Sequence, residues 1–158
     1  MSSDTTDVRE LALAVFATSG RLIGTGNVLV APLGLTSAWW QVLGALRYAP
    51  APLPTVSIAR NMGLTRQAVQ RIVDVLAERG LVTFQNNPQH RRAKLVVLTG
   101  AGLAAVTGAE QAVAPLDKEI ADRVGRDRIR DAIQTLDAMN AILAEWLDRA
   151  APAPNPNA

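Results

Sequence analysis

The stretch that decides the fold spans residues 55–82 and reads TVSIARNMGLTRQAVQRIVDVLAERGLV. Its pattern predicts a helix, a tight turn, a second helix and the start of a strand. Gly63 suits the left-handed conformation that ends the first helix, and Thr65 is a preferred N-cap for the second. The second helix carries apolar side chains at the i, i+3, i+4, i+7 spacing of one helix face, namely Val69, Ile72, Val73 and Leu76. We expect this face to lie in the core.

The opposite face of the second helix is polar, and its first two turns contain no acidic residue. It presents hydrogen-bonding side chains at Thr65, Arg66, Gln67, Gln70 and Arg71. Guanidinium and amide groups pair with base edges in the major groove of DNA. The face therefore predicts a DNA contact, and the alternative is an ordinary solvated helix surface.

Positive charge is concentrated in and just after this stretch. Residues 55–94 contain seven basic and two acidic residues, although the whole chain has a net charge of only +2. Residues 1–54 contain three of each sign, and residues 95–158 contain six basic and nine acidic residues. A basic block inside a neutral-to-acidic chain is typical of a surface that binds a polyanion.

The composition argues against several other kinds of chemistry. The chain has 158 residues, about one domain by length, with no cysteine and one histidine. Lack of cysteine excludes disulfides and thiolate metal sites, and a single histidine removes most nucleophilic and metal-binding arrangements. The glycines between Gly20 and Gly26 lie in a helical pattern rather than after a strand, so they do not form a phosphate-binding loop. We expect no enzymatic activity, cofactor or metal.

The ends of the chain indicate a soluble cytoplasmic protein with no membrane partner. Residues 1–7 are polar and acidic, unlike the basic start of a signal peptide. The apolar run Leu11–Ala17 has seven residues, whereas a bilayer-spanning helix needs about 20. The proline-rich residues 151–158 have little to bury and are expected to be disordered.

Helical patterns precede the basic block. The first helix is expected from about Thr6 to Val30, and its glycines favour a bend or a close helix contact. After a break, Thr36 is expected to cap a short helix. Its predicted inner side consists of Trp39, Trp40, Leu43 and Leu46. Residues 49–54 are proline-rich and predict a stiff linker, after which Thr55 is expected to cap the next helix.

A hairpin forms the second part of the basic block, and two further helices follow it. Residues 82–85 and 94–99 alternate as two strands, and the eight residues 86–93 between them form a long basic tip. Thr99 is expected to cap a long helix that is kinked or broken just before Pro115. Gly125 should end it, and an amphipathic helix should then run to about residue 150.

The hairpin tip is expected to contact DNA through its charged side chains, with an ordinary charged loop as the alternative. These side chains are His90, Arg91, Arg92 and Lys94. His90 is expected to be an ordinary surface residue, and a pH switch is the less favoured alternative.

A helix–turn–helix followed by a basic hairpin, with long helices before and after, resembles the multiple-antibiotic-resistance regulator (MarR) family of transcription factors. The resemblance is carried by residues 63–82, GLTRQAVQRIVDVLAERGLV, and by residues 87–102, NPQHRRAKLVVLTGAG. It implies a mainly α fold with a small two-stranded β-wing, in which a winged helix-turn-helix is flanked by long N- and C-terminal dimerisation helices.

The resemblance implies one domain over residues 1–150, with dimerisation helices at 1–35 and 100–150 and a DNA-binding lobe at 36–99. The expected dimerisation residues are Val8, Leu11, Val15, Ile129, Ile133, Leu136, Leu143 and Leu147. Their apolar faces are too large for a single winged helix to cover, which favours a homodimer over packing within one chain.

By resemblance, the polar residues from Thr65 to Arg71 occupy the exposed start of a recognition helix. Arg92 matches the arginine that members commonly place in the minor groove from the wing tip. The family wing usually reads Asp-x-Arg, whereas this chain has His90 at the first of these positions. The carboxylate that often orients the arginine is missing, which implies a more mobile wing or a different DNA contact.

The predicted function is that of a homodimeric, sequence-specific transcriptional regulator that binds a pseudo-palindromic DNA operator. The resemblance implies a repressor that is relieved by a small lipophilic or phenolic ligand. Candidate ligand-binding residues are Phe16, Trp39, Trp40 and Leu43, with core or dimer packing as the alternative for the tryptophans. The rival function is a winged helix used for protein assembly, without sequence-specific DNA binding.

Overall fold

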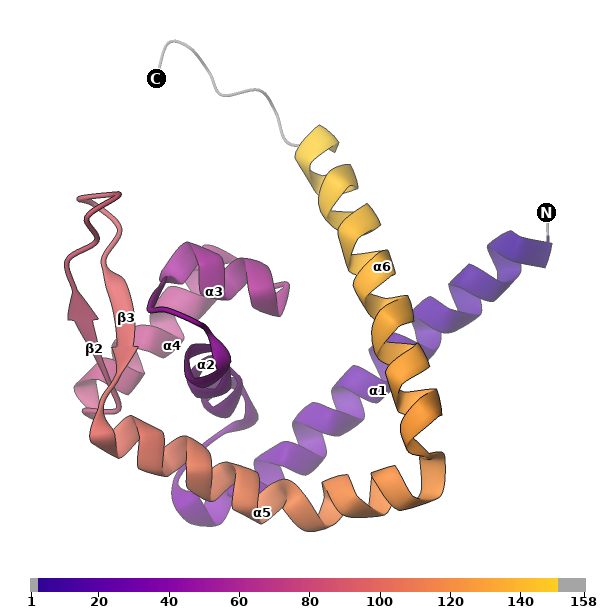
Figure 1. Cartoon of the computed structure of the whole chain (residues 1–158), viewed down its shortest axis with the longest axis horizontal. Coiled ribbons are helices and arrows are strands. Elements are labelled where there is room, and N and C mark those ends of the chain that lie inside the picture. Colours follow the sequence, from indigo (N-terminus) through magenta and orange to yellow (C-terminus); the bar gives the residue numbers. More distant parts are fainter. Residues whose placement is uncertain (1–2, 151–158) are drawn as a thin grey trace. The chain divides into compact units, whose positions relative to one another are not determined.

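The computed structural model describes residues 3–150 and is mainly helical over that range (Figure 1). Its elements in chain order are α1 (Ser3–Val30), the 3-10 turn η1 (Ala31–Leu33), α2 (Ser37–Tyr48), β1 (Leu53–Pro54), α3 (Thr55–Met62), α4 (Arg66–Glu78), β2 (Val82–Gln85), β3 (Leu95–Leu98), α5 (Gly100–Val124) and α6 (Arg126–Ala150). The predicted order of helices and hairpin is confirmed. The tail that was expected to be disordered, residues 151–158, lies outside the described residues. The chain forms two compact units, one up to Ala114 and one from Pro115 onward.

The first unit contains an antiparallel sheet in the order β1-β3-β2. The predicted hairpin is present, with Val82 opposite Leu98 at one end and Gln85 opposite Leu95 at the other. The third strand, β1, corrects the expectation of a plain linker, because Leu53 pairs with Val96. A proline is tolerated at the end of β1 because β1 is an edge strand, and one side of its backbone forms no hydrogen bonds to a neighbouring strand.

The apolar face of α4 lies in the core, as predicted. Val69, Val73 and Leu76 have no exposed surface, and Ile72 is half-buried against the same cluster. Fully buried side chains from α2, α3, β3 and α5 complete this core, namely Val42, Leu43, Ile58, Val96 and Val106. Each buried Leu or Val contributes about 1.5–3 kcal/mol, so α4 is held firmly with its polar face outward.

The inner side predicted for α2 is only partly right. Leu43 and Leu46 are buried, whereas Trp39 and Trp40 are half-buried and pack against the edge of the core. Val42, which the prediction omitted, has no exposed surface. A tryptophan is too large to be covered fully by a lobe of this size, so smaller aliphatic residues take the central positions.

Threonine side chains cap three of the helices. Thr36 accepts a hydrogen bond from the backbone N–H of Trp39, 3.2 Å away, and Thr65 accepts one from the N–H of Ala68, 3.1 Å away. Thr99 Oγ1 accepts from the N–H of Gly102, 3.0 Å away, and donates to the carbonyl of Gly80, 2.6 Å away. These bonds satisfy amide groups that a helix start otherwise leaves unpaired, so the predicted caps are confirmed at all three positions.

The expectation that Thr55 caps α3 is wrong. Pro54 occupies the N-cap position with an extended backbone, φ −74° and ψ 155°, and forms no side-chain cap. Thr55 is the first helical residue and is only 8% exposed. The reason is the unpredicted strand: pairing of Pro54 with Leu95 holds the chain extended up to the first residue of α3.

A close contact between α1 and α2 depends on Gly26. A Cβ atom at this position would lie 2.5 Å from Oγ of Ser37, whereas the other two glycines of α1 have no such neighbour within 4 Å. Ser37 Oγ donates to the carbonyl of Ile23, 2.7 Å away, and the Ser37 N–H donates to Oδ1 of Asn27, 2.8 Å away. The close helix contact favoured by the glycine content is therefore present at one of its three sites.

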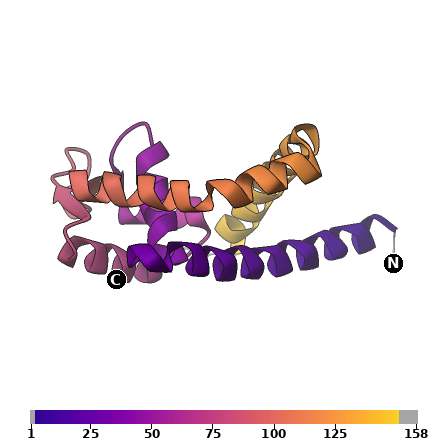
Figure 2. The same cartoon turned by 90° about the horizontal axis from the view of Figure 1, so that it is seen from below.

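Figure 2 shows α1 as one long helix, and much of its apolar surface is exposed. Its exposed large hydrophobic side chains are Val8, Leu13, Phe16, Leu22, Ile23 and Val28. An 18-residue stretch within Thr5–Leu33 has a mean hydropathy of 1.3, so this helix is long and apolar enough to cross a membrane, by length and composition alone. Counting only the uninterrupted apolar run missed this, because the intervening Gly, Ser and Thr residues are weakly polar. An apolar face that packs against a partner protein passes the same test.

The second unit comprises the end of α5 and the whole of α6. Of the kink or local break expected just before Pro115, the break is absent, since α5 continues through this residue to Val124. Proline removes one backbone donor, and the hydrogen bonds on either side keep the helix continuous. Gly125, with φ of 92°, separates α5 from α6 as predicted. No residue of α6 is buried.

Candidate DNA-binding surface

The first two turns of α4 present the predicted polar face. Arg66, Gln67 and Arg71 are exposed, and Gln70 is half-buried. Thr65 is also exposed, but its hydroxyl is engaged in capping the helix. Neither Arg66 nor Arg71 forms an ion pair with any residue that the structure describes. Both guanidinium groups are therefore free to meet an anion such as a DNA phosphate, or a base edge.

Gln70 differs from its neighbours because its amide has a fixed partner. Its Nε2 donates to Oδ1 of Asp74, 2.8 Å away and one helical turn further along α4. Asp74 was not among the residues predicted for the site from the sequence. The i, i+4 spacing of an amide and a carboxylate on one helix is the signal that could have identified it.

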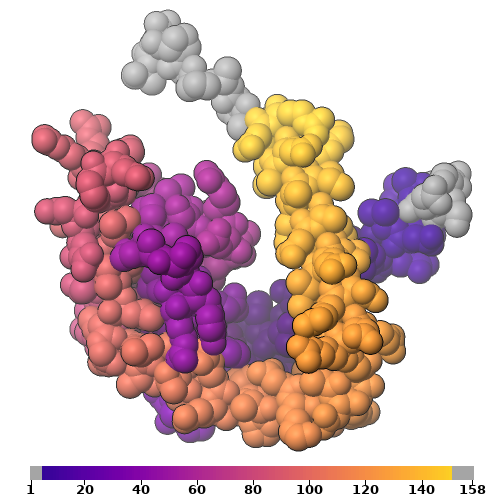
Figure 3. Space-filling view, viewed as in Figure 1, coloured from indigo at the N-terminus to yellow at the C-terminus, as the bar shows by residue number. Residues whose placement is uncertain are grey.

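The hairpin tip is built from two successive tight turns. The N–H of His90 donates to the carbonyl of Asn87, 3.2 Å away, and the N–H of Ala93 donates to the carbonyl of His90, 3.1 Å away. Asn87 also accepts through its side chain, from the N–H of Gln89 at 3.0 Å. Nine residues, 86–94, separate β2 from β3, and in the space-filling view they project from the lobe (Figure 3). The turns are thus fixed by the backbone, which leaves the basic side chains free.

The charged residues of the tip all reach solvent. His90, Arg91, Arg92 and Lys94 are exposed. Among the described residues, none of them forms an ion pair or a side-chain hydrogen bond. The missing wing carboxylate noted in the sequence is not replaced by another acidic partner in this part of the chain. The tip is therefore a cationic projection whose backbone is held by the turns and whose charged side chains have no partner among the described residues.

Three of the four candidate ligand residues, Trp39, Trp40 and Leu43, lie close together on α2, whereas Phe16 lies on α1. Leu43 has no exposed surface and belongs to the core. Trp39 is covered by the guanidinium of Arg79, whose Cζ lies 4.3 Å from the ring centroid, while Trp40 lies near Gly26. Phe16 is 73% exposed and ten residues before Gly26, which corresponds to roughly 15 Å along the helix.

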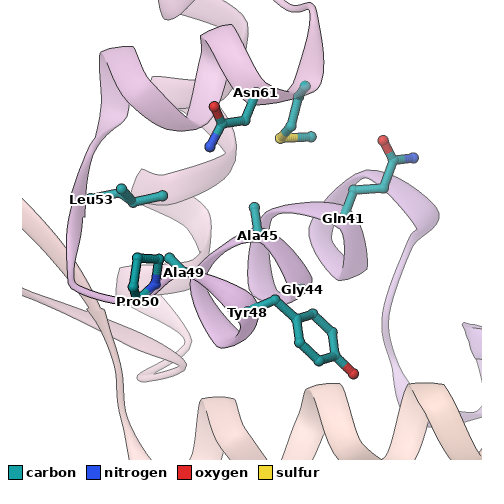
Figure 4. Close-up of a pocket in the computed structure, with 9 residues that line it drawn as sticks. Gln41, Gly44, Ala45, Tyr48, Ala49, Pro50, Leu53 and Asn61 are labelled. Atoms are coloured by element: carbon teal, nitrogen blue, oxygen red, sulfur yellow. The ribbon is translucent and has the colours of Figure 1, made fainter. Parts of the chain in front are cut away.

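An open groove lies between α2, α3 and β1, and its volume is about 680 Å³ (Figure 4). It is lined by Gln41, Gly44, Ala45, Tyr48, Ala49, Pro50, Leu53, Asn61 and Met62. The size is within the range of small-molecule sites. None of the four candidate ligand residues lines it, so the groove and the sequence-based ligand prediction concern different places on the protein.

A polar cluster that the sequence analysis missed joins α2 to α5. The hydroxyl of Tyr48 donates to Oε1 of Glu110, 2.7 Å away, and Arg47 pairs with Oε2 of Glu110 at 3.2 Å. Arg47 also donates to Oγ1 of Thr107 at 2.6 Å. The hydrogen bond to Glu110, followed by desolvation, raises the pKa of Tyr48 above its ordinary value of 10.0. Tyr48 and Glu110 are 62 residues apart in the sequence, so no local pattern could have predicted their contact.

Comparison with known proteins agrees with this architecture. A sequence model of the MarR family matches residues 33–93, the segment from η1 to the hairpin tip. An uncharacterised protein of Mycobacterium tuberculosis is 32% identical over 139 residues, which cover 84% of this chain and 96% of that protein.

CouR, a transcriptional repressor, gives two similar solved structures. The repressor bound to a 23-mer DNA duplex is 30% identical, with a TM-score of 0.67, over 83% of this chain and 92% of that one. CouR from Rhodococcus jostii RHA1 bound to p-coumaroyl-CoA gives a TM-score of 0.72 with 22% identity, over 82% of this chain and 91% of that one.

The family match, the relatives and the fold identify the same architecture over most of the chain. The MarR family consists of transcriptional regulators and not of enzymes, which confirms the expectation drawn from the composition. The chain belongs to the MarR family and is a winged-helix, DNA-binding transcriptional regulator.

Proposed function

We propose that this protein is a homodimeric repressor that binds a pseudo-palindromic operator. The start of α4 lies in the major groove, and the hairpin tip reaches the adjacent minor groove. In a dimer with two-fold symmetry, the two α4 helices meet half-sites whose centres are roughly 34–36 Å apart, one helical turn of DNA. The observation that carries this proposal is the pair of exposed, unpaired arginines on α4, a helix whose apolar face is packed in the core.

The DNA contacts are divided between two kinds of group. Arg66, Gln67, Gln70 and Arg71 share base reading and phosphate positioning in the major groove, with Thr65 at the capped start of the helix. Arg92, with His90, Arg91 and Lys94 beside it, contributes positive charge to a narrow, A/T-rich minor groove. The exposure of these side chains and their lack of acidic partners among the described residues support this division.

Dimerisation is supported by apolar surface that the described chain leaves uncovered. On α6, the exposed large hydrophobic residues are Ile133, Leu136, Ile142, Leu143, Trp146 and Leu147. On α1, Val8 is 58% exposed, while Leu11 and Val15 are half-buried, as is Ile129 on α6. Residues 1–35 and 100–150 therefore form the dimerisation part of a single domain, and residues 36–99 form its DNA-binding lobe. This pairing, rather than a membrane, covers the apolar face of α1.

Repression is relieved when a small lipophilic or phenolic ligand binds one arrangement of the lobes better than another. Only such a difference in affinity can shift the equilibrium between DNA-binding and non-binding states. Structures of CouR with DNA and with p-coumaroyl-CoA support a regulator of this kind. Phe16, Trp39, Trp40 and Leu43 remain the proposed ligand contacts, and a rearrangement of the lobe or a partner subunit is required to bring Phe16 to the other three.

Selection of binding sites from a random DNA pool tests this function. The proposal predicts enrichment of an inverted repeat whose half-sites are centred one helical turn apart. Binding that enriches no sequence, and that is equally weak on all duplexes, would instead support the rival function of a protein-assembly module. Genomic DNA beside the gene provides a second probe, because regulators of this family often control their neighbours.

A further inference from the structure

The hydrogen bond between Gln70 and Asp74 restricts how Gln70 meets DNA. A carboxylate only accepts hydrogen bonds, so the group 2.8 Å from Oδ1 of Asp74 must be the NH₂ end of the Gln70 amide. An amide has two nearly identical ends, and a carboxylate partner on one side fixes which end is which. Asp74 is itself exposed, and Gln70 is its only hydrogen-bond or ion-pair partner among the described residues.

The remaining capacity of the Gln70 amide is one donor and one acceptor. Its NH₂ group has two protons, and one of them is used by Asp74. The other proton and the oxygen Oε1 are left for DNA. Without Asp74, both protons would be available and the amide could rotate end for end.

One donor beside one acceptor matches the major-groove edge of adenine. Adenine offers N7 as an acceptor and its N6 amino group as a donor, whereas guanine offers two acceptors, N7 and O6. An amide with one N–H already donating to Asp74 can donate to only one of the two guanine acceptors. The Asp74 bond therefore favours adenine over guanine at the base that Gln70 meets.

We propose that Asp74 is a positioning residue which orients Gln70 and thereby makes it an adenine reader. This inference rests on the proposed function, because it requires α4 to lie in the major groove. Asp74 contributes no attraction to DNA of its own, since its negative charge opposes the phosphates. Its presence on the DNA-facing helix is accounted for by its effect on sequence discrimination.

The test is a binding titration with purified full-length protein and a set of duplexes in which each base pair of the selected operator is changed in turn. Gln70→Ala identifies the base pair at which discrimination depends on Gln70. At that pair, Asp74→Ala is expected to reduce the preference for adenine over guanine by about tenfold. The double variant is expected to have the same base preference as Gln70→Ala alone, because Asp74 acts on base preference only through Gln70.

Glu78→Ala is the matched control for charge. Glu78 is an exposed residue on α4, one turn after Asp74, and it has no ion-pair or side-chain hydrogen-bond partner among the described residues. Removing either carboxylate should strengthen binding to all duplexes, but only Asp74→Ala should alter base preference. Thermal unfolding of each variant shows whether the fold is intact. Both side chains are exposed to solvent, so neither substitution should disturb the core.

Several outcomes would overturn the inference. If Asp74→Ala keeps the full adenine preference, so that it changes the affinity for every duplex by the same factor as Glu78→Ala does, Asp74 does not orient Gln70. If Gln70→Ala leaves every base preference unchanged, Gln70 is not a base reader, although the DNA-binding function stands. If the wild-type protein distinguishes no sequences at all, the proposed function itself fails, and the inference fails with it.

Discussion

Tyr48 shows how a single exposed side chain can report on the contact between the DNA-binding lobe and α5. Its ring is 73% exposed, but its hydroxyl donates to Glu110 on α5. This hydrogen bond holds the proton, which is why the pKa of Tyr48 lies above 10.0. At pH values below the pKa of tyrosine in the unfolded chain, the hydrogen bond makes its full contribution to the stability of the fold. Its contribution is lost as the pH rises through the higher folded pKa.

Tyr48 is the only tyrosine of the chain, so its titration can be followed by tyrosinate absorbance without interference from another tyrosine. We expect a midpoint above 10.0 in the wild-type protein. Glu110→Ala removes both the acceptor and the nearby negative charge, and the midpoint should return toward 10.0. An unchanged midpoint in this variant would show that Glu110 does not bind the hydroxyl in solution.

Arg92 carries the main prediction for the wing. Its guanidinium is exposed and unpaired among the described residues, so nothing in this part of the chain competes with DNA for it. Arg92→Ala is expected to weaken operator binding by roughly 1–3 kcal/mol. A gel-shift titration measures this, with Arg123→Ala as a charge-matched control outside the lobe. Equal affinities for wild type and Arg92→Ala at physiological salt would contradict a wing contact.

The exposure of individual site residues could be predicted from helical periodicity alone. Once Val69 and Val73 are assigned to the core, Gln67 and Arg71 must point elsewhere, whereas Arg66 is exposed because it is the first residue of α4. The bond from Gln70 to Asp74 and the cluster around Glu110 could not be predicted, because they depend on rotamers and on contacts across the fold. Sequence patterns indicate which face of a helix a residue occupies, but not which side chain it contacts.

At the scale of elements, the junction between the hairpin and α5 is set by Gly102. A Cβ atom here would collide with the backbone carbonyl of Leu81, whose carbon would lie only 2.9 Å away. That carbonyl already accepts a hydrogen bond from the N–H of Thr99, 3.1 Å away. The chain leaving α4 and the first turn of α5 are thus in direct backbone contact, which only a glycine allows.

Gly102→Ala should therefore destabilise the protein by about 1–3 kcal/mol or more, because backbone atoms cannot move aside as a side chain can. Gly108→Ala is the control in the same helix, since its Cβ would meet only Cδ1 of Leu33 at an ordinary 3.6 Å. That variant should be stabilised by up to about 1 kcal/mol, the difference in helix propensity. Urea unfolding measures both. Similar effects from the two substitutions would contradict the tight junction.

Elements with a strong local signal were predicted well, and those defined by a distant partner were not. The caps at Thr36, Thr65 and Thr99 follow from local chemistry and are present. Strand β1 has two residues and exists only because β3 lies beside it, so its own sequence of Leu53 and Pro54 reads as a linker. The start of α3 was wrong for the same reason.

At the scale of the whole molecule, the dominant feature is apolar surface on α1 and α6 that is not covered within the described chain. Phe16 is 73% exposed, Leu147 is 71% exposed and Trp146 is 62% exposed. Large apolar patches are rarely exposed on a monomeric soluble protein, and each of these two helices exposes several large apolar side chains. The proposed homodimer covers it, and the family assignment is consistent with that arrangement.

Replacing Leu143 and Leu147 together by Glu should convert the dimer into a monomer. Each lost apolar contact costs about 1.5–3 kcal/mol, and the new charges would have to be buried. Gln134→Glu adds a charge at an exposed polar position of the same helix and should leave the dimer intact. Sedimentation velocity distinguishes the two states. A double variant that still sediments as a dimer would place the interface elsewhere.

The central claim is that a cationic helix and hairpin bind the phosphates of a duplex, and the salt dependence of operator affinity tests it most directly. Fluorescence anisotropy of the wild-type protein with its selected operator should give a logarithm of the binding constant that falls linearly with the logarithm of salt concentration. The expected slope is about −0.9 for each phosphate neutralised, so several contacts per subunit give a steep line. Affinity that does not change with salt would contradict the account.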